Sequence, residues 1–72
     1  MAFRNITITD TLTGRTITGE IGTVEMVFQE WLDTEVPDDL HPVIRRFWRA
    51  AQTPSAYAVD LATFLALEVE WS

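Results

Sequence analysis

Few side chains in this chain can serve as nucleophiles, bases or thiolate ligands. It contains no cysteine and one histidine, His41, which lies between Leu40 and Pro42 near the expected start of a helix. Nucleophilic catalysis needs a serine, threonine or cysteine beside a base such as histidine, and at a helix start His41 is expected to cap the helix or face solvent. The three glycines are spread over strands and a turn, whereas a phosphate-binding loop gathers them. We therefore expect a protein that is not an enzyme.

Carboxylates are the most abundant chemically active groups. Asp33, Glu35, Asp38 and Asp39 lie close together in the sequence. A calcium loop has a central glycine and regularly alternating ligands, and this segment has neither. Helix capping accounts for Asp38 or Asp39 without a metal. We expect no metal and no cofactor.

The carboxylates also determine the net charge. The formal net charge is −6, and all five cationic residues are arginine. Non-specific binding to nucleic acid needs a cationic surface that displaces counterions, so direct binding to DNA or RNA is not expected. An acidic surface instead complements a basic protein surface, where it speeds encounter and selects the partner. The predicted partner-binding residues follow one helix and the loop after it: Glu25, Glu30, Asp33, Glu35, Asp38 and Asp39. The alternative is a solvated face that only keeps the protein soluble.

Two further groups are secondary interface candidates. Arg45, Arg46 and Arg49 have no acidic residue three or four positions away, so they pair with another element, stay solvated or bind a carboxylate or phosphate of a partner. An aromatic stripe, formed by Tyr57, Phe64 and Trp71, is more typical of a core. Where other elements leave it uncovered, it favours a homodimer or a partner contact.

The N-terminal residues have the pattern of a β-hairpin. Isoleucine alternates with threonine on both sides of residues 10–14, and Gly14 suits a backbone with positive φ. We predict a hairpin over residues 3–21 with one isoleucine face and one threonine face. At least one strand edge is then free to accept a partner strand.

The middle of the chain changes to helical periodicity. From Val24 the apolar residues recur three and four positions apart, which predicts a helix over residues 23–34 that ends before Pro37. A second helix is predicted over residues 39–52, with Pro42 tolerated in its first turn.

The last segment has two interpretations. It is apolar on nearly every side, which predicts a third helix over residues 54–68 that is buried and central. Residues 66–71 also alternate as a strand does, with apolar Leu67, Val69 and Trp71 between Glu68 and Glu70. No glycine or proline separates the two interpretations, so a third antiparallel strand over residues 66–71 remains the alternative.

These elements predict one α+β domain, a β-hairpin packed on three helices. No stretch approaches the roughly 18 apolar residues of a membrane span, and the first ten residues lack the pattern of a signal peptide. We expect a cytoplasmic, protein-binding module. More specifically, we expect an inhibitor from a mobile element or phage that docks as a nucleic-acid mimic on a basic surface of a host protein. The alternative is a structural or accessory subunit that forms a homo-oligomer or joins a larger assembly.

Overall fold

The segments that alternate isoleucine with threonine form two antiparallel strands, β1 (Asn5–Asp10) and β2 (Thr16–Glu20), in the computed structural model, which describes residues 4–72. The Asp10 side chain shapes the turn, because its Oδ1 accepts a hydrogen bond from the Leu12 N–H at 2.9 Å. Gly14 has φ of 78°, where an L side chain is strained. The predicted hairpin is confirmed; Phe3, its first predicted residue, lies outside the described range.

The C-terminal residues form a third strand, β3 (Leu67–Trp71), antiparallel to β1. The sheet order is β2-β1-β3, so the first strand of the chain is the central one. Of the two interpretations of the C-terminal segment, the strand is therefore the one that the structure contains.

The third helix, α3 (Ala56–Phe64), is shorter than the predicted helix over residues 54–68. Ser55 caps its start, with its side chain accepting a hydrogen bond from the Ala58 N–H at 3.1 Å. Its end is made by Ala66, which has φ of 59°. In this left-handed conformation the Ala66 N–H donates to the Thr63 carbonyl at 3.2 Å, one of the two bonds of a Schellman cap. The helix thus ends without the glycine that normally marks such a turn.

The other helices lie close to their predicted positions. They are α1 (Ile21–Glu35) and α2 (His41–Ala50), the latter preceded by a short 3₁₀ turn, η1 (Asp38–Leu40). The helix predicted over residues 39–52 is therefore divided at its start and ends earlier. Pro42 lies in the first turn of α2, where its missing N–H leaves no helical bond unmade.

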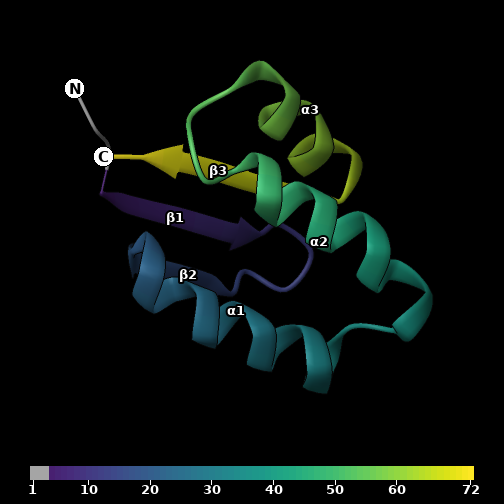
Figure 1. Cartoon of the computed structure of the whole chain (residues 1–72). Helices are drawn as coiled ribbons and strands as arrows, with labels where there is room; N and C mark the ends of the chain where they lie inside the picture. The colour runs from purple at the N-terminus through teal and green to yellow at the C-terminus, as the bar shows by residue number, and fades with distance from the viewer. Residues whose placement is uncertain (1–3) are drawn as a thin grey trace.

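The helices cover one face of the sheet. Figure 1 shows α1 beside β2, α3 beside β3 and α2 between them. The core fills the space between the two layers, with the side chains of Ile6, Ile8, Ile17, Val24, Phe28, Trp31, Leu32, Ile44, Phe47, Trp48, Ala51, Ala58, Ala62 and Leu67 buried. The prediction of a central third helix is corrected here, because α3 buries only Ala58 and Ala62. These small side chains let α3 approach closely. Leu61 is partly buried against the core, whereas Tyr57, Val59 and Phe64 are exposed.

The other face of the sheet carries polar side chains. Thr7 lies opposite Thr18, and their hydroxyl oxygens are hydrogen-bonded at 2.8 Å. Glu68 and Glu70 extend this face onto β3, since they alternate with the core-facing residues of that strand. The threonine face predicted from the sequence is therefore present, and the two glutamates of β3 lie along one side of it.

Replacing Ala66 by glycine is expected to raise the free energy of unfolding by up to about 1 kcal/mol, because glycine adopts a positive φ without the steric cost that alanine bears. Urea denaturation of the two proteins measures the change. Ala66→Val is the opposing control, since a β-branched side chain is least compatible with this conformation. A lower midpoint for the glycine variant would contradict the role assigned to this turn.

Candidate functional site

A large hollow lies in the surface where four separate segments meet. It has a volume of about 640 Å³ and lies between the hairpin turn, the end of α1, the start of α2 and the turn before β3. Its lining is mostly apolar and consists of Asp10, Leu12, Thr13, Arg15, Trp31, Glu35, Val36, Pro37, Leu40, Ile44, Leu65 and Leu67. This volume lies within the range of about 300–1,000 Å³ that is usual for ligand pockets. We call this hollow the cleft.

Two leucines make the rim of the cleft unusually apolar. Leu12 is 82% exposed and Leu40 is 41% exposed. Trp31 and Ile44 lie deeper and are largely buried. Exposed leucine side chains beside a concave apolar surface are typical of a place where another molecule binds.

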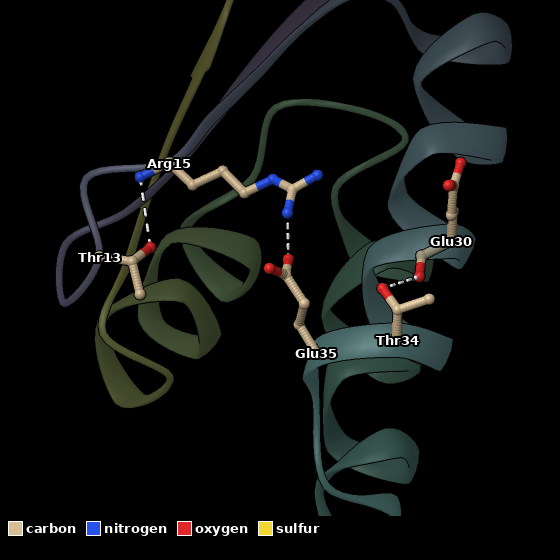
Figure 2. A network of polar contacts seen from close by, with 5 residues as sticks. All are labelled: Thr13, Arg15, Glu30, Thr34 and Glu35. Atoms are coloured by element: carbon tan, nitrogen blue, oxygen red, sulfur yellow. Dashed lines mark hydrogen bonds and ion pairs between the residues drawn. The ribbon is translucent and has the colours of Figure 1, made fainter.

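An ion pair joins the two sides of the cleft. Figure 2 shows Arg15, which follows the hairpin turn, extending its guanidinium to the Glu35 carboxylate at the end of α1. Both side chains are about half exposed, so solvent screens their attraction and the pair contributes little to stability. The pair instead fixes the position of two charged groups next to the apolar lining.

His41 belongs to the structure around the cleft. Its Nε2 lies 3.0 Å from the carbonyl oxygen of Val36, which can only accept, so Nε2 carries the proton that is donated. Asp38 lies 3.8 Å from the same nitrogen. The expectation that His41 caps its own helix or faces solvent is wrong, because no side chain caps the start of α2 and the partly buried ring instead joins α2 to Val36 at the end of α1.

The predicted acidic residues are all exposed, but they do not form one surface. Glu30 and Asp33 lie on the outer side of α1, away from its buried residues. Glu35 lies on the side of Trp31 and lines the cleft. Asp38 and Asp39 lie in η1, directly before the cleft residue Leu40. The structure therefore places Glu35 in the lining of the cleft and Asp38 and Asp39 between the lining residues Pro37 and Leu40, and it places the other three elsewhere.

Glu25, the first of the predicted acidic residues, faces the arginines of α2. It lines a groove of about 380 Å³ together with Arg45, Arg49 and the intervening Trp48. Among residues 4–72 no carboxylate forms an ion pair with these arginines or with Arg46. Glu25 and the two groove arginines thus partly cancel each other's charge without forming an ion pair. Each group then attracts a charged partner less strongly than it would alone.

The three aromatic candidates separate into two groups. Tyr57 and Phe64 lie on α3 and are 54% and 77% exposed. Trp71 lies on β3 instead, and its indole N–H donates a hydrogen bond to the Ala51 carbonyl at 2.8 Å. Trp71 is therefore tied to the core, and the exposed part of the predicted stripe is confined to α3.

Potential metal ligands do not cluster in the part of the chain that the structure describes. No group of three or more potential ligands converges within residues 4–72. His41, the one histidine, is engaged as described above. None of the helices in this range is both long and apolar enough to cross a bilayer.

The cleft residues Leu12, Trp31, Leu40 and Leu65 were not among the predicted site residues. Only Leu12 carried a signal in the sequence, because a large apolar residue in a hairpin turn is unusual. Comparison of the chain with protein-family models, curated proteins and solved structures found no match.

Proposed function

We propose that the chain is a protein-binding module without catalytic activity, and that its cleft takes an apolar side chain from a basic partner surface. The observation that carries the proposal is an apolar cleft of about 640 Å³ whose lining residues Pro37 and Leu40 flank the exposed carboxylates of Asp38 and Asp39. Protein interfaces commonly combine an apolar anchor in a pocket with a charged rim. The cleft supplies the pocket and the carboxylates supply the rim.

Charge supports a basic partner. The net charge of −6 repels acidic surfaces and accelerates the approach of basic ones. A basic surface of this kind often serves to bind nucleic acid. More specifically, we propose that the protein is a cytoplasmic inhibitor, encoded by a mobile element or phage, that competes with nucleic acid for such a surface.

Capture from a lysate of the source organism, followed by titration of the purified partner, tests this function. We expect Leu40→Asp to weaken binding by at least about tenfold, because a charge then occupies the apolar pocket. Asp38→Lys with Asp39→Lys should slow association and reduce its dependence on salt. Met26→Asp is the matched control, since Met26 is 78% exposed and lies outside the cleft.

Two results would contradict this proposal. One is a partner whose affinity is unchanged in both cleft variants, which would place the contact elsewhere. The other is a partner with an acidic binding surface. Circular dichroism of each variant confirms that the fold is retained, as expected for substitutions at exposed positions.

A second candidate function is an accessory subunit that self-associates through α3. It is favoured by the exposure of Tyr57 and Phe64, which lie seven positions apart and therefore on the same side of that helix. Light scattering over a concentration series should then show a mass above that of the monomer, and Phe64→Ser should return it to the monomer. A constant monomer mass in the unmodified protein would exclude the homo-oligomer.

A further inference from the structure

The outer edge of β3 carries unpaired backbone groups. Asn5 and Ser72 exchange both of their backbone hydrogen bonds, each at 3.0 Å. Along an antiparallel pair of strands, residues that bond to the partner strand alternate with residues that do not. Counting back from Ser72, Glu70 and Glu68 therefore direct their backbone groups toward β1. The N–H and C=O groups of Leu67, Val69 and Trp71 therefore point away from the sheet. Within residues 4–72 no backbone group bonds to them.

A groove runs along this edge. It has a volume of about 370 Å³ and lies between β3 and α3. Val59, Ala62 and Thr63 form its helix side, and Val59 is 44% exposed. An extended chain beside β3 would thus meet a line of backbone partners on one side and small apolar side chains below.

The charges at this edge are all negative. Glu68 and Glu70 are exposed, and their neighbours on β1 are the uncharged Thr9 and Thr7. Neither glutamate has an ion-pair partner among the described residues. An added strand would place alternate side chains directly beside these two carboxylates.

Self-pairing of β3 is opposed by the same charges. Two copies could pair antiparallel through the outward backbone groups of β3 in three registers. In these registers Val69 lies opposite Val69, Leu67 or Trp71 of the other copy. Each of these registers places glutamate opposite glutamate, since Glu68 and Glu70 alternate with those residues. Like charges directly opposite one another destabilise a strand pair, which favours a basic strand over a second copy.

We propose that the outer edge of β3 accepts an extended segment of another protein in which basic residues alternate with apolar residues. The basic side chains lie on the polar face of the sheet beside Glu68 and Glu70. The apolar side chains lie in the groove against Val59, and the backbone extends the sheet by strand addition. This surface shares only Leu67 with the lining of the cleft, and the proposal does not depend on the function proposed for the cleft.

The probe is a short capped peptide that alternates lysine with valine, titrated into isotopically labelled protein. We expect the amide resonances of Leu67, Val69 and Trp71 to shift and their hydrogen exchange to slow. A peptide with the same composition in which the lysines are grouped together should bind on the order of tenfold more weakly, since it loses the alternation. N-methylation of the backbone groups that face β3 should abolish binding.

Charge reversal provides the matched variants. Glu68→Lys with Glu70→Lys should weaken the lysine–valine peptide on the order of tenfold and transfer the preference to a glutamate–valine peptide. Glu20→Lys is the control, because Glu20 is exposed at the far edge of the same sheet, on β2. All these side chains are exposed, so the variants should retain the fold.

Three results would overturn the proposal. The first is equal binding of the alternating and grouped peptides, which would show charge attraction without strand addition. The second is a set of shifts that leaves Val69 and Trp71 unchanged and is confined to β2 or to the residues of the cleft. The third is the absence of binding at millimolar peptide, which would leave Glu68 and Glu70 as groups that only keep the edge unpaired. None of these results bears on the capture of a partner by the cleft.

Discussion

Phe28→Ala is expected to lower the free energy of unfolding by about 3–5 kcal/mol. Phe28 is fully buried between the sheet and the helices, and its ring stacks on Trp48 with 4.9 Å between the ring centroids. It also contacts the rings of Trp31 and Phe47. A core in a domain this small rarely supplies more than about 3–5 kcal/mol, so the variant should be largely unfolded at 37 °C. Thermal unfolding followed by circular dichroism measures the change.

Phe64→Ala is the matched control for this substitution. Phe64 has the same side chain but is 77% exposed, so its removal should change the free energy of unfolding by less than about 0.5 kcal/mol. A loss for Phe64→Ala as large as that for Phe28→Ala would contradict the exposure described for Phe64. It would also indicate that α3 is covered in solution, as the self-association of that helix would require.

Trp71→Phe should lower the free energy of unfolding by about 1–3 kcal/mol, because it leaves the buried Ala51 carbonyl without a donor. Phenylalanine keeps an aromatic ring in place, whereas the indole N–H that donates at 2.8 Å is lost. Ala51 is fully buried at the end of α2, so water cannot easily replace the donor. Urea denaturation should show a lower midpoint at an unchanged slope.

Tyr57→Phe provides the comparison for Trp71→Phe. It also removes a polar group from an aromatic ring, but Tyr57 is 54% exposed, and we expect little change in stability. A loss below about 0.5 kcal/mol for Trp71→Phe would mean that another donor serves Ala51. Rapid solvent exchange of the indole proton in the unmodified protein would point to the same conclusion.

The elements with a clear period were predictable from the sequence. The hairpin followed from isoleucine alternating with threonine, and α1 followed from the spacing of Val24, Phe28, Trp31 and Leu32. The C-terminal segment was ambiguous because the turn between α3 and β3 is made by Ala66 in a left-handed conformation. Alanine favours a helix. Ala66, which ends α3, therefore indicated in the sequence that the helix continues.

The cleft could not be predicted in the same way. It is formed by segments as far apart as Leu12 and Leu65, and no local pattern relates them. Arg15 and Glu35 are separated by twenty positions, which is beyond any helical or strand spacing. The sequence identified carboxylates that border the cleft, because charge is visible in composition. It did not identify the apolar lining, because leucine and tryptophan are usual in a core.

The sheet order also constrains the sequence of events during synthesis on the ribosome. The central strand β1 is translated first, and its hairpin partner β2 follows immediately, but its other partner β3 spans residues 67–71. Thr7 pairs with Glu70, more than sixty residues later. One side of β1 therefore stays exposed until those residues have emerged, and closing so long a loop is slow relative to hairpin formation. Nascent chains that stop before Leu67 should consequently remain bound by chaperones and sensitive to protease.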